Sequence, residues 1–381
     1  MDSSVRIKRI DSSRISIAKF VQSARWKCRA AFAQAMFFIS LAVAFSLSAC
    51  NVSENSSKDT WQIVKKTDTA MGTIVSATLY GSGENWQEDA ARLEEDAFTQ
   101  VRNLEYGLLS AKEPSSEVSL INEAGSATLS DGLSQLLSDC FEVSGASDGA
   151  FDVTIGSLTK LWNIDEYALS GEGRPPSEKE IESALLYAGY EKASLSGKEI
   201  RLSEGMQLDL GAVGKGYALD RLSDWISSEE GLTKGLKAGV ISLGGSIMTL
   251  GDKPDGTAWK IAVVDPCAPD QQIGYLELSG EHYVSTSGDY ERYFEADGKR
   301  YHHILNAKSG YPAESGLKSV TILADSGLMS DILSTACFVL GWDRGEALAE
   351  RFGAGILAVD ENGGIRYNQR MKECFHKTGG N

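Results

Sequence analysis

Histidine is scarce in this sequence, basic side chains are outnumbered, and no long apolar run occurs beyond the first fifty residues. The 381 residues include 4 histidines, and 37 lysines and arginines stand against 53 aspartates and glutamates, for a formal net charge of −16. A chain with this negative charge repels nucleic acid and anionic lipid surfaces. We therefore expect no nucleic-acid partner. Without a long apolar run after residue 50, we expect no internal transmembrane helix.

The cysteines do not form a metal-binding pattern. Two of the six lie in the first fifty residues, and the others are Cys140, Cys267, Cys337 and Cys374. None of these has the spacing of a metal-ligand pair. Cys140 and Cys337 fall on apolar helical patterns, which predicts that they are core residues. A disulfide is compatible with an extracytoplasmic protein, but its pairing does not follow from the sequence.

Residues 1–49 have the features of a signal peptide. A basic stretch precedes an apolar run over residues 30–47, and small residues follow just before Cys50. The ending Leu47-Ser48-Ala49-Cys50 resembles a bacterial lipobox, which predicts that Cys50 is lipidated and anchors the protein to the cell membrane, facing the periplasm or the cell exterior. A signal-anchor helix or a plain secretory signal are the alternatives. Cleavage would remove eight basic and two acidic residues and change the net charge from −16 to −22.

The remaining chain has the pattern of one large domain. Residues 50–60 predict a polar tether, and residues 61–370 contain no repeat or long linker, which fits a single domain or two merged lobes. Apolar residues at helical spacing predict helices over 86–108, 133–141 and 328–340, and one after Gly214. Ser177 and Glu180 form a capping-box pattern that opens a further helix.

Short strands dominate the second half of the chain. Strands are predicted at 240–243, 259–264, 275–278, 319–323 and 356–359, and Asp297-Gly298 predicts a hairpin turn between 292–295 and 301–305. Neighbouring strands with hairpin signals favour antiparallel pairing. The expected fold class is therefore α+β, with mixed or antiparallel sheets packed against helices.

Residues 208–220 combine a short apolar run with a glycine-rich turn and the start of a helix. Gly211, Gly214 and Gly216 surround Lys215. Free backbone N–H groups at a helix start, together with a lysine, suit a phosphate. The spacing matches neither the dinucleotide fingerprint nor the Walker loop, so a merely structural turn is the alternative.

Two further segments place polar residues in apolar surroundings. Asp152 and Thr154 interrupt a strand-like stretch, for which a capped turn is the simpler interpretation. His302 and His303 are adjacent at an expected strand end. Neighbouring strand residues point to opposite faces, so at most one of the two histidines faces any one site.

A fourth segment carries oxygen ligands on an apolar helix. Asp331 and Thr335 are four residues apart and therefore share one face. Buried polar groups need partners. One option is that Ser330 or Asp331 caps its own helix, and the other is a hard cation of the Mg²⁺ type.

Taken in order, these segments resemble the ApbE family of FAD:protein FMN transferases, as do the residues around Met71 and over 110–122. The resemblance covers roughly residues 61–367. It implies FAD contacts at Met71, Ala150, Phe151, Asp152, Asp209, Lys215 and Leu305. Lys112, also at the flavin, stands where an aromatic side chain is common.

The resemblance also implies a metal site and a catalytic histidine. The implied ligands are the side chains of Asp331 and Thr335 and the backbone carbonyl of Ala212, with Ser334 at a position that holds a carboxylate in some members. His303 matches the family's histidine, whose role would be to place the nucleotide or pass a proton. The sequence departs from the family pattern at Asn306 and Ala307, where Asp-Pro is usual, and at Ser309, where Thr is usual.

The activity implied by the resemblance is FMN transfer. A threonine or serine hydroxyl of a partner flavoprotein would attack the FMN-side phosphorus of FAD, AMP would leave, and Mg²⁺ (or Mn²⁺) would assist. An FAD pyrophosphatase would use the same residues with water as the nucleophile. A non-enzymatic, FAD-binding lipoprotein is the third alternative and would need no metal.

Overall fold

The computed structural model describes residues 61–228 and 235–378. The expected signal peptide, tether and lipidated Cys50 lie outside these residues. No helix in the described part of the chain is both long enough and apolar enough to span a bilayer.

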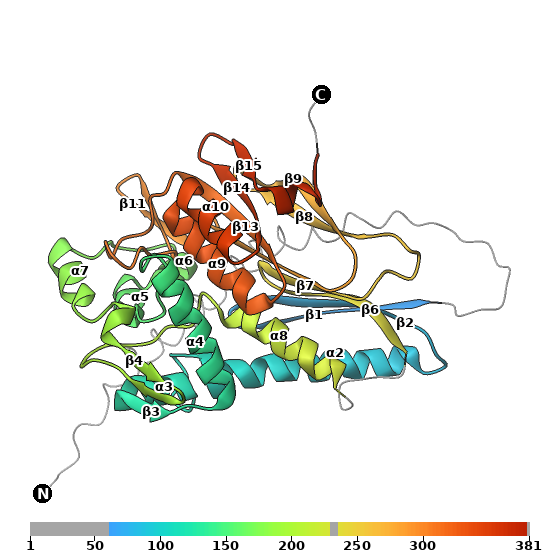
Figure 1. Ribbon diagram of the computed structural model, residues 1–381, viewed down its shortest axis with the longest axis horizontal. Coiled ribbons are helices and arrows are strands. Elements are labelled where there is room, and N and C mark those ends of the chain that lie inside the picture. The colour runs from blue at the N-terminus through green and yellow to red at the C-terminus, as the bar shows by residue number, and fades with distance from the viewer. Residues whose placement is uncertain (1–60, 229–234, 379–381) are drawn as a thin grey trace, which may run out of the picture.

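An eight-stranded antiparallel sheet forms the centre of the fold (Figure 1). Its strand order is β1-β2-β6-β7-β10-β13-β14-β15. The strands are β1 (Gln62–Ala70), β2 (Thr73–Gly81), β6 (Leu236–Leu243), β7 (Ser246–Leu250), β10 (His282–Gly288), β13 (Leu317–Ala324), β14 (Gly355–Asp360) and β15 (Ile365–Tyr367). A smaller antiparallel sheet consists of β8 (Trp259–Asp265), β9 (Ala268–Leu278) and β16 (Phe375–Lys377).

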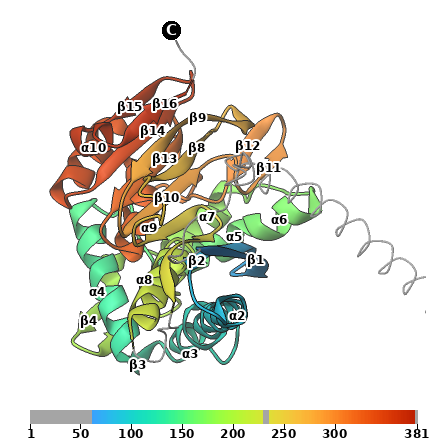
Figure 2. The ribbon, with the colours of Figure 1, turned by 90° about the vertical axis from the view of Figure 1, so that its right-hand side faces the viewer.

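Alternation along the strands gives the large sheet two apolar faces. Ile322 packs in a core with helices, whereas the next residue, Leu323, packs in a different core against the small β8–β9–β16 sheet. The helices that cover the first face are α2 (Trp86–Leu104), α8 (Gly214–Ser227) and α9 (Gly327–Leu340), and α10 (Trp342–Arg351) follows α9 (Figure 2). Helices α8 and α9 are thereby held side by side over the middle of the sheet.

The rest of the chain packs around these layers. It comprises η1 (Glu105–Leu109), α3 (Glu117–Ala124), β3 (Ser126–Thr128), α4 (Asp131–Ala146), α5 (Gly156–Trp162), α6 (Ile164–Ser170), α7 (Glu178–Leu185), η2 (Tyr190–Lys192), β4 (Ser194–Ser196), β5 (Glu199–Arg201), β11 (Tyr293–Ala296), β12 (Lys299–His302) and α11 (Gln369–Lys372). Trp162 is the centre of a separate apolar cluster there, and its indole N–H donates to the carbonyl of Gly310 at 2.7 Å.

The structure confirms the α+β class and the antiparallel pairing. The five strands expected in the second half lie within β6, β8, β9, β13 and β14. Asp297 and Gly298 have φ values of 52° and 75° in the β11–β12 turn, as a tight hairpin requires. Ser177 and Glu180 form both capping-box hydrogen bonds. Cys140 and Cys337 are buried free thiols in the core.

Some local expectations are wrong. The helical pattern over 86–108 continues past α2 as the π-helix η1, and the strand expected over 301–305 ends at His302. The capped turn favoured for residues 152–154, by contrast, is confirmed, because Asp152 Oδ1 accepts from both the N–H and the hydroxyl of Thr154 at 2.7 Å. A side chain that bonds to its own backbone in this way competes with strand pairing.

Candidate functional site

The start of α8 is the centre of the site. The glycine-rich segment turns at residues 211–213, and the helix begins at Gly214. Most of the N–H groups that the sequence offered to a phosphate already have protein acceptors. Gly211 donates to Asp209 at 2.8 Å, and Val213 and Gly214 donate to the carbonyl of Leu210. The turn is therefore held together by its own chain.

The N–H of Gly216 donates to Asp331 on the neighbouring helix. Its acceptor is Oδ2 of Asp331 at 2.6 Å, and Oδ1 of the same carboxylate accepts from the hydroxyl of Ser246 at 2.6 Å. Asp331 and Ser246 are 3% and 1% exposed. This buried carboxylate thus lies at the positive end of α8, where the helix dipole stabilises an anion.

The interpretation of Ser330 or Asp331 as a helix cap is wrong. Helix α9 begins at Gly327, four residues before Asp331, and Ser326 caps it by accepting from the N–H of Met329. Asp220 of α8 also accepts from the N–H groups of Gly327 and Leu328, at 2.6 and 2.8 Å. Because Ser326 and Asp220 already cap the start of α9, Asp331 does not cap its own helix and instead accepts a hydrogen bond from Gly216 of α8.

Two glycines allow α8 and α9 to approach this closely. A Cβ atom on Gly216 would lie 2.0 Å from the carbonyl oxygen of Gly327, and one on Gly327 would lie 2.3 Å from the carbonyl oxygen of Gly216. Any side chain at either position would separate the helices. The hydrogen bond between Gly216 and Asp331 depends on this contact.

The bond to Asp331 also determines what the carbonyl of Ala212 can do. A regular helix would bond the N–H of Gly216 to the carbonyl four residues earlier, which is that of Ala212. Because this N–H goes to Asp331, the carbonyl of Ala212 receives no hydrogen bond from it. The carbonyl of Ala212 thereby lacks its usual helical donor.

Hydroxyl groups complete the oxygen-rich surroundings of Asp331. Ser334 donates to the carbonyl of Asp331 at 3.0 Å and lies 2.8 Å from the hydroxyl of Ser287, which is also 3.4 Å from that of Thr335. Ser334 and Thr335 thus face β10, and Asp331, one helical turn earlier on α9, faces Ser246 of β7. Oxygen donors without nitrogen or sulfur suit a hard cation such as Mg²⁺.

This donor set fits a cation that is shared with a phosphate ligand. In the described part of the chain, no three His, Cys, Asp or Glu side chains are close enough together to hold a metal ion. Among the residues expected as ligands, Asp331 supplies the carboxylate, and Ala212, Ser334 and Thr335 supply carbonyl and hydroxyl oxygens. Mg²⁺ is commonly held by one or two carboxylates, with water and substrate phosphates supplying the remaining oxygens.

Lys215 and His303 lie beside this centre. No ion pair holds the ammonium of Lys215 within the described residues, which leaves it available to an anion. His303 is partly buried, and its Nδ1 lies 3.3 Å from the carbonyl of Arg292, so Nδ1 carries the proton and Nε2 has the lone pair. Burial, assisted by the positive charge of Arg292, lowers the pKa of His303 to about 3, and the imidazole is neutral at physiological pH.

His302 has a different environment, as expected for adjacent strand residues. Its Nε2 is 3.0 Å from the carbonyl of Ala313, and its ring packs edge-on against Phe338. Burial lowers its pKa as well. His302 is a core residue, and His303 is the histidine at the site.

Lys112 takes part in an ion-pair network behind His303. Its ammonium lies 3.1 Å from Asp165, which also lies 3.0 Å from the guanidinium of Arg292. Burial alone would raise the pKa of Asp165, but the two positive charges outweigh it and lower the pKa. Since the carbonyl of Arg292 also accepts from the backbone N–H of His303, this network links Lys112 to His303.

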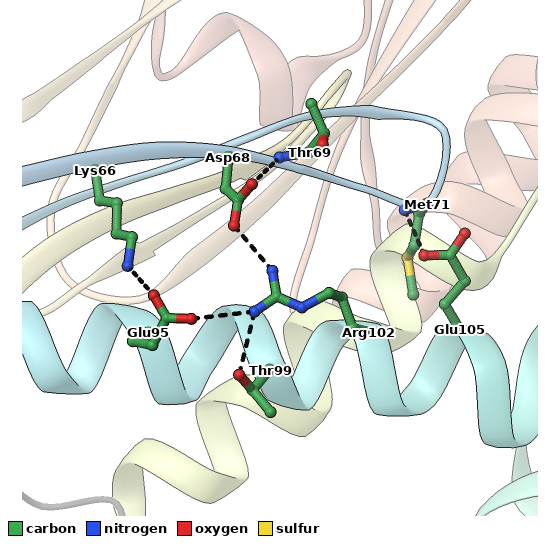
Figure 3. Close-up of polar contacts among 8 residues, drawn as sticks. All are labelled: Lys66, Asp68, Thr69, Met71, Glu95, Thr99, Arg102 and Glu105. Atoms are coloured by element: carbon green, nitrogen blue, oxygen red, sulfur yellow. Dashed lines mark hydrogen bonds and ion pairs between the residues drawn. The ribbon is translucent and has the colours of Figure 1, made fainter.

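Met71 is fixed in the tight turn between β1 and β2 (Figure 3). It has a left-handed φ of 51°, and its N–H donates to the carboxylate of Glu105 at 2.7 Å. Arg102 on the adjacent α2 binds Asp68 of β1 at 2.9 Å. These contacts tie the turn to α2 and η1, where Met71 packs against both large apolar cores.

The other expected FAD contacts are held by neighbouring loops. Asp209 accepts from the hydroxyl of Thr159 at 2.6 Å and from Gly211, so it joins α5 to the start of α8. Asp152 also accepts from the N–H of Tyr190 at 2.7 Å, and burial raises its pKa against these hydrogen bonds. Ala150, Phe151 and Leu305 are buried. The hydrogen bonds of Asp152 explain its local structure, and none of them connects it to Asp331.

Four site residues were missed by the sequence reasoning: Asp220, Ser246, Glu291 and Arg292. Ser246 and Asp220 act on residues 85 and 107 positions away. Contacts between residues so far apart in the chain produce no local pattern in the sequence. Glu291 and Arg292 lie in the loop between β10 and β11, close before the histidine pair, and their charges were the only available signal.

Comparison with known proteins gives one consistent result. The ApbE family model matches residues 71–359. The FAD:protein FMN transferase of Klebsiella pneumoniae is 34% identical over 300 residues, covering 77% of this chain and 87% of the relative, and that of Treponema pallidum is 31% identical, covering 75% and 81%. The crystal structure of the ApbE protein of Thermotoga maritima superposes with a TM-score of 0.72 at 32% identity, covering 83% of this chain and all of the other.

Proposed function

This chain belongs to the ApbE family of FAD:protein FMN transferases, and we propose that it transfers the FMN moiety of FAD to a threonine or serine hydroxyl of an acceptor flavoprotein, with release of AMP. The observation that carries the proposal is the convergence at the start of α8. There Asp331, the carbonyl of Ala212 and the ammonium of Lys215, which no ion pair engages in the described part of the chain, lie around one helix N-terminus.

The reaction makes demands that these residues can meet. Transfer of a phosphoryl-linked group requires the pyrophosphate charge to be neutralised and the attacking oxygen to be aligned. Lys215 and the positive end of α8 supply fixed positive potential. Asp331, Ser334, Thr335 and the carbonyl of Ala212 would hold a Mg²⁺ or Mn²⁺ ion, which when bound would neutralise phosphate oxygens.

The flavin side of FAD would be held by a separate group of residues. The contacts described above hold Met71 in the β1–β2 turn, Asp209 before α8 and Lys112 in the loop after η1. We place the neutral imidazole of His303 next to the nucleotide, where its Nε2 lone pair accepts a hydrogen bond. Removing that contact would misalign FAD without changing net charge.

We further propose that lipidation of Cys50 anchors the enzyme to the cell membrane, facing the periplasm or the cell exterior. The lipobox-like ending and the strongly acidic body support this proposal, because such a body offers no basic patch to bind anionic lipids. The polar tether over residues 50–60 would separate the enzyme domain from the bilayer.

A labelling experiment tests the proposed activity. Residues 61–381 are incubated with FAD, Mg²⁺ and a candidate acceptor domain, and in-gel flavin fluorescence and AMP release are measured together. Transfer predicts fluorescent acceptor and AMP in equal amounts, both abolished by EDTA. Release of AMP and free FMN without labelled acceptor would instead identify a pyrophosphatase, and binding of FAD without AMP release would identify a binding protein.

A further inference from the structure

Glu291 places a further carboxylate near Lys215 and Asp331. It lies in the loop between β10 and β11 and is exposed to solvent. Within the described part of the chain, no hydrogen bond or close ion pair engages its side chain. Its neighbour Arg292, by contrast, binds Asp165 and the backbone of His303. The loop is therefore anchored by Arg292, and the carboxylate of Glu291 is free.

This carboxylate lies close to the strand end that binds Asp331. A Cβ atom on Gly245 would lie 3.2 Å from Oε1 of Glu291. The next residue, Ser246, donates to Asp331. Glu291 and Asp331 are thus near the same end of β7, and Glu291 interacts electrostatically with Lys215, Arg292 and Asp331.

A free anion in this place opposes FAD binding. The pyrophosphate would lie beside Lys215, within the field of Glu291, and like charges repel each other. Within residues 61–228 and 235–378, Glu291 stabilises no other part of the fold through a hydrogen bond or close ion pair, so the repulsion it exerts on FAD needs another explanation. A group that accepts a proton during the reaction provides one.

The surroundings favour proton acceptance by Glu291 over His303. Although solvent reaches the Glu291 side chain, the protein atoms around it partly desolvate the carboxyl and raise its pKa, and the positive charges of Lys215 and Arg292 oppose this rise. A raised pKa makes the carboxylate a stronger base. The pKa of His303, about 3, makes its imidazole a weak one.

We propose that Glu291 is the catalytic residue that accepts the proton of the attacking hydroxyl, a role that rests on the proposed FMN-transferase function. The acceptor's O–H bond breaks and its proton passes to Oε of Glu291. The freed electron pair forms a bond from the acceptor oxygen to the FMN-side phosphorus. The bond from that phosphorus to the bridging oxygen breaks, and AMP leaves with the bridging oxygen and its electron pair.

The test compares Glu291→Gln with Glu295→Gln. Glu295 lies on β11, is exposed, and makes only a 3.6 Å ion pair with Arg300. Single-turnover AMP release, acceptor labelling and FAD affinity by fluorescence quenching are measured from pH 5 to 9. We expect Glu291→Gln to slow AMP release by about 100-fold or more, the scale of a lost general base. FAD affinity should stay the same or increase, and Glu291→Asp should recover part of the rate.

The pH profile separates a proton acceptor from a structural residue. Wild-type and Glu295→Gln rates should decrease together toward acid pH, and the residual rate of Glu291→Gln should lack that acid limb. A Glu291→Gln rate within threefold of wild type would overturn the proposal. So would a loss of rate that follows a loss of FAD affinity, or a residual rate with the wild-type pH profile.

The same measurements distinguish failure of the proposed function. If wild-type protein releases AMP but labels no acceptor, the nucleophile is water and transferase function is wrong. Glu291→Gln must then slow that hydrolysis equally for the proton-acceptor role to survive. If wild-type protein releases no AMP at all, both proposals are wrong.

Discussion

Asp331 has a structural role in the site, and the same side chain is the proposed metal ligand. Its two oxygens accept from Gly216 and Ser246, and each carboxylate oxygen retains a second lone pair for a further partner. Replacing it with alanine would leave two buried donors unpaired, at about 1–3 kcal/mol each, and would confuse instability with lost chemistry. Asparagine preserves the shape and removes the charge.

Asp331→Asn should therefore abolish divalent-cation binding at moderate cost in stability. We expect FMN transfer to decrease by about 100-fold or more, because the loss of a metal that neutralises the pyrophosphate costs several kcal/mol of transition-state stabilisation. Mn²⁺ binding followed by electron paramagnetic resonance provides a readout independent of activity. Unchanged Mn²⁺ affinity in the variant would contradict the assignment of Asp331 as a ligand.

Lys215→Ala should weaken FAD binding by about 1.5–3 kcal/mol, the scale of a charge-assisted hydrogen bond. Its ammonium has no ion-pair partner in the described residues, so its loss should scarcely affect the melting temperature. Fluorescence quenching by FAD measures the affinity, and Lys179→Ala, an exposed lysine on α7, is the matched control. Equal FAD affinity in the two variants would show that Lys215 does not bind the phosphates.

Helices α8 and α9 support each other's N-termini. Asp220 of α8 accepts from Gly327 and Leu328 at the start of α9, and Asp331 of α9 accepts from Gly216 near the start of α8. Burial raises the pKa of Asp220 in spite of these hydrogen bonds. The two elements are therefore coupled: a change in their separation disturbs the caps and the candidate metal site together.

Gly216→Ala tests this coupling between elements. Its Cβ would lie 2.0 Å from the carbonyl oxygen of Gly327 and 2.9 Å from Cγ of Asp331, so the helices must move apart. We expect a loss of stability of about 1–3 kcal/mol and a parallel loss of Mn²⁺ and FAD affinity. Gly107→Ala in η1 is the control, because a Cβ there meets nothing within 4 Å. Similar melting curves for the two variants would mean that the contact is not tight.

At the scale of the whole molecule, one buried carboxyl should make stability depend on pH. Glu94 on α2 is 2% exposed, one of its oxygens has no hydrogen-bond partner in the described structure, and desolvation raises its pKa from 4.5 to about 7, against the charge of Lys66. Between about pH 4.5 and 7 the folded protein binds more protons than the unfolded chain at this site. This contribution to stability is therefore present at low pH and is lost as pH rises through 7.

Glu94→Gln should remove that dependence. Thermal melts at pH 5 and pH 8 should show the variant gaining stability relative to wild type mainly at pH 8. Glu123→Gln on the exposed face of α3 should behave as wild type at both values. An equal shift of the Glu94→Gln melt at both pH values would point to a packing effect and not to ionisation.

The membrane anchor is a second property of the whole protein. Cys50→Ser, expressed as the full chain, should move the protein from the membrane to the soluble fraction, because the acyl chains would be the anchor of an acidic domain. Mass spectrometry of the mature N-terminus checks processing. A processed variant that still sediments with membranes would rule out the lipid anchor.

Local patterns in the sequence determined a large part of the fold. The Asp297-Gly298 hairpin, the Ser177 capping box and the spacing of Asp331 and Thr335 all depend on residues within a few positions of each other. Their physics is local backbone geometry, so a sequence reading captures it. The ordered series of segments also sufficed to indicate the ApbE family, which the comparisons confirm.

The tertiary structure alone decided how the site is assembled. Gly216 and Asp331 are 115 residues apart, and their hydrogen bond exists because two glycine backbones meet where α8 crosses α9. That contact diverts an amide from the carbonyl of Ala212 and leaves this oxygen for a ligand. The exposed β10–β11 loop likewise brings Glu291 near Lys215 and Asp331. Side chains far apart in the chain come together only when the sheet and helices pack, and neither composition nor spacing encodes that packing.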